Sequence, residues 1–150
     1  MERKIQYLAK GIDINMSKPK IMLVDDDKKF LKIFCKLIKM NDIEVITYHN
    51  PQKALKDKDI VCYDCIVVDL IMPEMNGIEF LREIKKKFYL KNVIVLSAQG
   101  TISTAVSAMK EGAYTFLEKP SDIERIVDKI MDIVNDNKLE ITFNDSFIGK

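Results

Sequence analysis

Histidine and cysteine are scarce in this sequence, with one histidine and three cysteines among 150 residues. A structural zinc site takes about four such ligands, and the single histidine, His49, is distant in sequence from the C-x-x-C pair formed by Cys62 and Cys65. A thioredoxin-like C-x-x-C opens a helix after a strand, whereas this pair precedes an apolar run. We therefore predict no metal or redox role for the pair, and interpret Cys65 as a small apolar residue at the start of a strand.

Long hydrophobic runs and a surplus of one charge are also missing. No apolar run approaches the ~20 residues that a membrane-spanning helix needs, and the first 15 residues lack the uninterrupted apolar segment of a signal peptide. We therefore expect no membrane contact and a cytoplasmic location. The net charge is +1, so we expect no direct contact with nucleic acid by this stretch of chain.

What the sequence does contain is an alternation of two periodicities. At 150 residues, 47% of them hydrophobic, it suits one compact domain. Short apolar runs predict strands over 20–24, 44–48, 66–69, 92–96 and 114–117, and three- and four-residue spacing predicts helices over 28–40, 51–56, 77–88, 101–111 and 122–135. Five strands alternating with five helices predict an α/β domain with a parallel sheet and right-handed crossovers.

The segment from Cys65 to Gly77, CIVVDLIMPEMNG, carries the main functional signal. Its β-branched run is typical of a strand buried on both faces, and the run ends on a single acid, Asp69. Open α/β sheets place their chemistry at the carboxyl ends of strands. A helix-capping role for Asp69 is disfavoured because the next helix begins only near Asn76.

The string D-L-I-M-P-E-M-N-G resembles the phosphoacceptor loop of bacterial two-component response regulator receiver domains, which are CheY-like. The resemblance implies a flavodoxin-like, doubly wound sheet of strand order 2-1-3-4-5 flanked by five helices. It also implies that Asp69 accepts a phosphoryl group from a sensor histidine kinase. It further implies that the domain is no enzyme beyond its own phosphorylation and dephosphorylation.

In that topology the ends of four strands bring a set of polar groups together: Asp25, Asp26, Asp69, Ser97 and Lys119. Carboxylates crowded at ~4 Å repel one another unless a cation neutralises them, and hard oxygen ligands of this kind select Mg²⁺. By the resemblance, Asp26, Asp69 and the Ile71 backbone carbonyl bind the metal and Asp25 acts through water. The triple Asp leaves open whether the pair is Asp25-Asp26 or Asp26-Asp27, and the apolar run ending at Val24 favours the first.

The resemblance assigns further roles around the acids. Ser97 and Lys119 would contact phosphoryl oxygens, and Phe116 would be the aromatic switch, although core packing is about equally good as an explanation of an aromatic residue in a strand. Pro73, Gly77 and Pro120 would shape the loops. Two positions would tune the lifetime of the phosphoryl group, Ile71 and Gln99. Neither can act as a general base for water, so we predict a lifetime of minutes or more.

The ends of the chain suggest how the domain is used. We interpret 1–18 as an N-terminal extension of uncertain status, 19–137 as the receiver and 138–150 as a linker into a following domain. Residues 138–150 and the segments ISTAV and GAYTFLEKP resemble NtrC-like transcriptional activators. A transcriptional output is therefore expected, and a homodimer through the surface of 101–111, 114–117 and 122–135 is a candidate assembly.

Three alternatives stay open. A free-standing receiver would act by binding another protein. A haloacid-dehalogenase-like phosphatase would use Asp25-x-Asp27 as its nucleophile motif, but leaves Asp69 and the Met-Pro loop without a role. An FMN-binding electron carrier of the same topology would be yellow.

Overall fold

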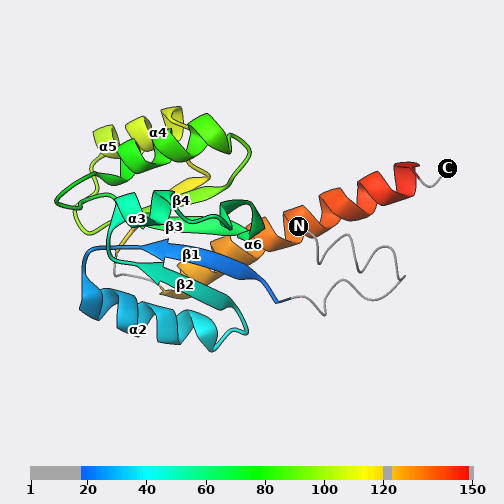
Figure 1. The fold of residues 1–150 in the computed structure, drawn as a ribbon, viewed down its shortest axis with the longest axis horizontal. Coiled ribbons are helices and arrows are strands. Elements are labelled where there is room, and N and C mark those ends of the chain that lie inside the picture. The colour runs from blue at the N-terminus through cyan, green and yellow to red at the C-terminus, as the bar shows by residue number, and fades with distance from the viewer. Residues whose placement is uncertain (1–17, 120–122, 149–150) are drawn as a thin grey trace.

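Five parallel strands form one sheet in the order β2-β1-β3-β4-β5 (Figure 1). The computed structural model describes residues 18–119 and 123–148. The strands are β1 (Lys20–Val24), β2 (Glu44–Tyr48), β3 (Cys65–Asp69), β4 (Val93–Ser97) and β5 (Thr115–Glu118), and each neighbouring pair is parallel. The strand order predicted from the sequence is confirmed.

Helices cover both faces of this sheet. They are α2 (Lys28–Lys39), α3 (Pro51–Leu55), α4 (Gly77–Lys87), α5 (Ile102–Lys110) and α6 (Ile123–Ile148), with a short 3₁₀ turn, η2 (Ile60–Cys62), before β3. Helices α2 and α6 pack on one face, and α3, α4 and α5 pack on the other (Figure 1). The doubly wound architecture is therefore also confirmed.

The core explains why two strands, β3 and β4, are nearly continuous apolar runs in the sequence. Side chains alternate between the faces of a strand, so that in β3 Val67 faces α2 and α6 while Ile66 and Val68 face α3, α4 and α5. Every residue of β3 and of β4 is buried. A strand enclosed in this way must be apolar on both faces, and polar side chains therefore collect at its end.

Side-chain caps fix where the helices begin, and so where the strand-to-helix loops end. Asp27 accepts a hydrogen bond from the Phe30 N–H at the start of α2, and Asn50 caps α3 ahead of Pro51. Asn76 and Glu79 cap each other's backbone at the start of α4. Such caps contribute about 1 kcal/mol each, and they keep the loops at the functional edge short.

One expected helix end differs from the structure, and one helix packs through a face that its apolar spacing does not mark. The last helix was expected to end near residue 135, but α6 is a single helix of 26 residues that ends at Ile148. In α5 the apolar stripe does not face the sheet. Ile102, Val106 and Met109 are 86%, 45% and 49% exposed, and Ala108 is the buried residue of the helix. The periodicity identified this helix correctly but did not identify the face that packs.

Some predictions fall outside the described residues or stay untested. The extension over 1–18 lies almost entirely outside them, as does Pro120, and the domain boundaries remain predictions. In the part of the chain that is described, no helix is both long enough and apolar enough to cross a membrane. Cys62 is exposed in η2 and Cys65 is buried in β3, where burial raises the pKa of the Cys65 thiol.

Candidate functional site

Three acidic side chains meet at the carboxyl edge of the sheet. Asp25 follows β1 and Asp69 ends β3, and the two strands are neighbours in register, with Val24 opposite Val68. Each of Asp25, Asp26 and Asp69 offers a carboxylate oxygen, and these oxygens lie within 4.8 Å of one another. Asp25 and Asp69 are buried, and Asp26 is exposed. The arrangement follows from topology, because parallel strands end at a common edge.

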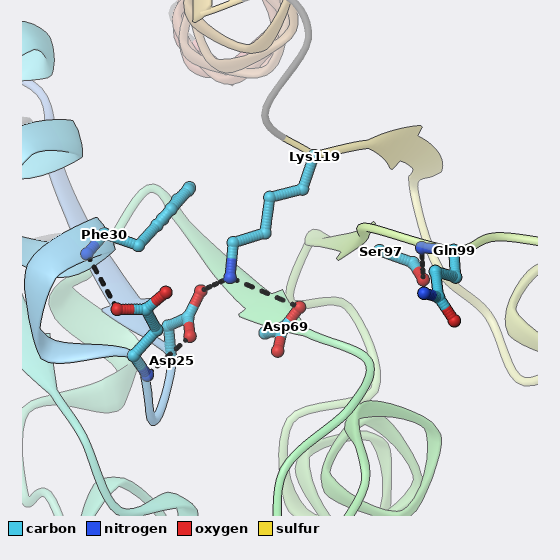
Figure 2. Close-up of polar contacts among 7 residues, drawn as sticks. Asp25, Phe30, Asp69, Ser97, Gln99 and Lys119 are labelled. Carbon is cyan, nitrogen blue, oxygen red and sulfur yellow. Dashed lines mark hydrogen bonds and ion pairs between the residues drawn. The ribbon is translucent and has the colours of Figure 1, made fainter.

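Lys119 brings a positive charge into this cluster from the end of β5. Its Nζ lies 2.7 Å from Asp25 Oδ2 and 3.8 Å from Asp69 Oδ1, so that the ammonium group stands between the two carboxylates (Figure 2). The Lys119 backbone N–H donates to the Ser97 carbonyl at 2.8 Å, which ties the ends of β5 and β4 together. We use the name acid side for Asp25, Asp26, Asp69 and Lys119.

The acid side carries more negative charge than one lysine offsets. Burial and the neighbouring Asp25 charge raise the pKa of Asp69 to about 7, against a smaller lowering by Lys119. Burial also raises the pKa of Asp25, even though Asp25 accepts a hydrogen bond from Lys119. A divalent cation would relieve this repulsion, and clustered carboxylate oxygens are the ligands that Mg²⁺ prefers. The donor set therefore fits the predicted metal.

The geometry also bears on which two acids of the Asp25-Asp26-Asp27 run form the metal pair. The Asp27 carboxylate is used as the cap of α2 and bonds the Phe30 N–H at 3.1 Å. Its own backbone N–H donates to Asp25 Oδ1 at 2.9 Å. Asp25 and Asp26 belong to the cluster with Asp69. Because Asp27 caps the helix while Asp25 and Asp26 lie with Asp69, the structure favours Asp25-Asp26 as the metal pair.

Ser97 lies at the same edge but is turned toward its own loop. It is fully buried at the end of β4, and its Oγ accepts a hydrogen bond of 3.2 Å from the Gln99 N–H (Figure 2). The half-buried Phe116 packs close by. A Cβ added to Gly100 would lie 2.6 Å from Phe116 Cε1, so the ring occupies the space that a side chain at position 100 would need. We use the name hydroxyl side for Ser97, Gln99, Gly100 and Phe116.

The loop after β3 is held tightly against Asp69. The Gly77 N–H donates to the Leu70 carbonyl at 2.7 Å, and a Cβ at Gly77 would come within 2.6 Å of the Asp69 carbonyl oxygen. Glycine is needed at this position because two backbone segments approach closely. Between them, Ile71 is 58% exposed, and Pro73 is exposed at the outer turn of the loop.

Sequence reasoning missed one residue of the site, Phe30. Its ring centroid lies 4.1 Å from Lys119 Nζ, and its ring stacks on Phe34 at 4.8 Å. Phe30 has the helical spacing of an apolar stripe in α2, and it does border the core cluster on that face of the sheet. Its contact with a lysine 89 positions later in the printed sequence depends on how α2 sits against the end of β5, which periodicity does not report.

Comparison with known proteins gives a consistent result. The family model described as "Response regulator receiver domain" matches residues 21–131. A chemotaxis protein CheY of Listeria monocytogenes is 35% identical over 111 residues, which cover 73% of this chain and 93% of that protein. The DNA-binding transcriptional regulator NtrC of Azospirillum brasilense is 32% identical over 122 residues, covering 81% of this chain and 25% of that protein.

A solved structure extends the similarity to three dimensions. The beryllofluoride-activated NtrC4 receiver domain dimer, determined in solution, matches with a TM-score of 0.72 and 30% identity. The match covers 78% of this chain and 97% of that one. The chain thus spans nearly all of the chemotaxis protein but only about a quarter of the transcriptional regulator.

Proposed function

Because this chain belongs to the family of response regulator receiver domains, we propose that Asp69 accepts a phosphoryl group from a sensor histidine kinase and that the hydroxyl side responds to it. The observation that carries the proposal is the acid side itself. Three carboxylates with oxygens within 4.8 Å of one another, and one lysine between two of them, end the strands of a receiver fold.

The chemistry asks little of the protein beyond position and charge. An Asp69 carboxylate oxygen forms a bond to phosphorus as the P–N bond of the phosphohistidine breaks, and the imidazole leaves with the electron pair. Lys119 is within reach of the Asp69 carboxylate, at 3.8 Å, and offsets charge on the equatorial oxygens. Asp69 must be ionised to attack, which its pKa of about 7 opposes in the metal-free protein.

Asp26, Asp69 and the Ile71 backbone carbonyl would hold Mg²⁺, with Asp25 acting through water. The bound ion supplies positive charge that keeps the carboxylates ionised and neutralises the phosphoryl oxygens. The exposure of Asp26 suits this role, because Mg²⁺ keeps several waters when it binds to protein. The Asp25 carboxylate already accepts hydrogen bonds from Lys119 and from the Asp27 N–H. Its role would therefore be to orient these neighbours, and not to bind the metal directly.

Ser97 and Phe116 would transmit the signal. The Ser97 hydroxyl would give up the hydrogen bond that it accepts from the Gln99 N–H, and would itself donate to a phosphoryl oxygen. The Phe116 ring lies against Gly100 in the same loop, so a movement of that loop changes the space available to the ring. Such a pair is a two-state element biased by a local change of charge.

The output we favour is control of transcription. A DNA-binding regulator, NtrC, is among the similar proteins, and α6 continues to Ile148, through most of the segment 138–150 that we interpret as a linker to a further domain. A free-standing receiver is the second candidate, favoured by a match that covers 93% of a chemotaxis protein. A cytoplasmic location belongs to the transcriptional proposal, because bacterial transcription takes place there.

Helix α5 carries the surface that we propose for assembly. Ile102, Val106 and Met109 are exposed at helical spacing, next to β5, which carries Phe116. An exposed apolar stripe of this kind marks an interaction surface. The NtrC4 receiver domain is a dimer in its beryllofluoride-activated form, and we propose a homodimer through α5, β5 and the start of α6 here.

Phosphate uptake by Asp69→Asn tests the proposed chemistry. The wild type should take up one phosphate per chain from phosphoramidate in Mg²⁺, and Asp69→Asn should take up none, because an amide does not attack phosphorus. Asp27→Asn is the matched control, since asparagine is an equally good helix cap, and it should label normally. One phosphate per chain on Asp69→Asn, measured by intact mass, would disprove the assignment.

Sedimentation with and without beryllofluoride tests the assembly. We expect the wild type to form dimers more strongly when beryllofluoride is present than when it is absent. Val106→Glu should stay monomeric in both conditions, because a charge would interrupt the apolar stripe of α5. Met40→Glu replaces an apolar side chain that is 76% exposed at the C-cap of α2 and serves as the control. An unchanged association state at tens of micromolar protein would count against this surface.

A further inference from the structure

The ammonium group of Lys119 has a third neighbour besides two carboxylates. The Phe30 ring presents its face to Nζ at 4.1 Å from the centroid, while Asp25 and Asp69 lie at 2.7 Å and 3.8 Å. The Lys119 side chain is only 12% exposed. Much of the water that would solvate this charge is therefore replaced by two acids and one aromatic face (Figure 2).

Phe30 is held in place from both ends. Its backbone N–H is bonded to the Asp27 carboxylate at the first turn of α2. Its ring stacks on Phe34 with 19° between the planes, and Phe34 is 1% exposed in the core. Because Phe34 cannot move without disturbing the core, the Phe30 ring offers Lys119 a fixed surface.

The three neighbours of the ammonium group are not equivalent. Asp25 and Asp69 both belong to the acid cluster, so a cation held by that cluster competes with Lys119 for the same oxygens. An aromatic face attracts an ammonium group through its quadrupole and does not compete for a hard divalent ion, which prefers oxygen. The ring is thus the neighbour of Lys119 that stays available when the carboxylates are engaged.

We propose that Phe30 is a positioning residue that keeps Lys119 directed into the site through a cation–π contact while the carboxylates are engaged elsewhere. Lysine has a long flexible side chain and loses rotamer entropy when it is fixed. A ring in a fixed position already restricts the Lys119 side chain, so less of its rotamer entropy remains to be lost when a phosphoryl group binds. The inference rests on the proposed function, because it assigns Phe30 a part in phosphoryl binding.

Ordinary packing is the competing explanation, since Phe30 also borders the core cluster between the sheet, α2 and α6. The two explanations separate if the electronic character of the ring is changed at nearly constant shape. Stepwise fluorination of the ring weakens the negative face while volume changes little. A packing role is insensitive to this series, and a cation–π role is not.

The experiment compares the wild type with Phe30→Tyr, Phe30→Leu and chains carrying mono-, di- and trifluorophenylalanine at position 30. Beryllofluoride affinity is measured at saturating Mg²⁺, and Mg²⁺ affinity is measured without beryllofluoride. Phe30→Tyr should stay within about twofold of the wild type. Phe30→Leu should bind beryllofluoride about threefold to tenfold more weakly, and the fluorinated chains should fall progressively between. Mg²⁺ affinity should not weaken in any of them.

Three other results would overturn the proposal. A flat fluorination series overturns the role of Phe30, as does a loss of Mg²⁺ affinity equal to the loss of beryllofluoride affinity, which would indicate general loosening of the site. The fluorinated chains keep the test decisive if Phe30→Leu fails to fold. A wild type that binds no beryllofluoride in Mg²⁺ overturns the proposed function as well, so the two failures are distinguishable.

Discussion

The acid side and the hydroxyl side end neighbouring strands of one sheet, yet they are built differently. On the acid side the functional groups contact one another, with Lys119 Nζ 2.7 Å from Asp25 and 3.8 Å from Asp69. On the hydroxyl side they contact their own loop, with the Ser97 hydroxyl bonded to the Gln99 N–H and the Phe116 ring against Gly100.

The difference follows from where the strands lie. Asp25 and Asp69 extend β1 and β3, which are interior strands of the sheet with buried residues on both faces. Phe116 belongs to β5, the edge strand, where three of the four residues are half-buried or exposed. A site that accepts charge needs fixed groups, and a site that reports it needs groups with a second position available. The ends of β1 and β3 hold the carboxylates that accept charge, with Lys119 reaching them from the end of β5. The loop after β4, together with Phe116 of β5, forms the part that can change position.

The largest expected effect comes from Asp69→Asn, which removes one of the crowded negative charges on the acid side. The pKa of Asp69 is raised to about 7 in the folded chain, so Asp69 stays protonated in the folded state where it is already ionised in the unfolded one. Stability is therefore lost as pH rises from about 4 through about 7. Without metal, Asp69→Asn should be more stable than the wild type, by a margin that widens by about 2 kcal/mol between pH 5 and pH 8.

Urea unfolding in EDTA at pH 5, 6, 7 and 8 measures this margin. The raised pKa of Asp25 acts in both proteins and largely cancels in the difference. A margin that is constant across this range would show that Asp69 is not destabilised by its neighbours. The acid side would then be no more strained than the hydroxyl side.

The second prediction separates adjacent acids of the triple Asp. Asp26→Asn should weaken Mg²⁺ binding at least tenfold, because Asp26 is the exposed member of the acid cluster and a charged ligand is lost. Asp27→Asn should change it by less than about twofold, since the Asp27 side chain serves α2 and asparagine caps equally well. Metal titration of both variants decides, and the reverse ranking would move the metal pair to Asp26-Asp27.

Much of the acid side could be predicted from the sequence. Buried parallel strands read as apolar runs, and the acids that stop them, Asp25 and Asp69, must meet at the common edge. Lys119 could be placed there for the same reason. The contact of Phe30 with Lys119 could not be predicted, because it depends on how a helix packs against the end of a strand far away in sequence.

The limits of prediction were greater for α5 and α6. The apolar positions Ile102, Val106 and Met109 have the spacing of a core face but are exposed, because α5 packs through the small Ala108 instead. Helical periodicity gives a stripe without saying what covers it. The end of α6 was missed because residues 138–148 lack the apolar spacing of the preceding turns, whereas a helix can continue past the domain it packs on.

The third prediction concerns the lifetime of the phosphoryl group, which depends on both sides. Ile71 follows Asp69 by two residues and is 58% exposed, and it has no group that could orient an attacking water. Ile71→Asp adds a carboxylate that can act as a general base, and should shorten the lifetime about tenfold, from minutes or more, as phosphate release in Mg²⁺ would show. Gln99→Ala is the matched change on the hydroxyl side and should have little effect. A wild-type lifetime of seconds would refute the assignment of these positions.

The smallest expected effect tests the hydroxyl side. Gly100 does not have a positive φ, so its backbone does not require glycine, and in an unconstrained loop Gly100→Ala would gain about 0.4–1 kcal/mol from the unfolded state. Here the new methyl group would meet Phe116 Cε1 at 2.6 Å and Cζ at 3.0 Å. The ring or the loop must move, at a cost of order 1–3 kcal/mol for an overpacked site. The net loss of unfolding free energy should be about 1 kcal/mol.

A double-mutant cycle assigns this loss to its cause. In a Phe116→Ala background the space is open, so Gly100→Ala should be neutral or slightly stabilising, and the coupling free energy between the two positions should be about 1 kcal/mol or more. Zero coupling would mean that the ring yields without cost. The Ser97 loop would then not restrict the Phe116 ring, and the position of the ring would have to be set by β5 alone. A clear coupling would instead show that a glycine in the Ser97 loop holds the ring where it is, so that movement of the loop and movement of the ring are one event.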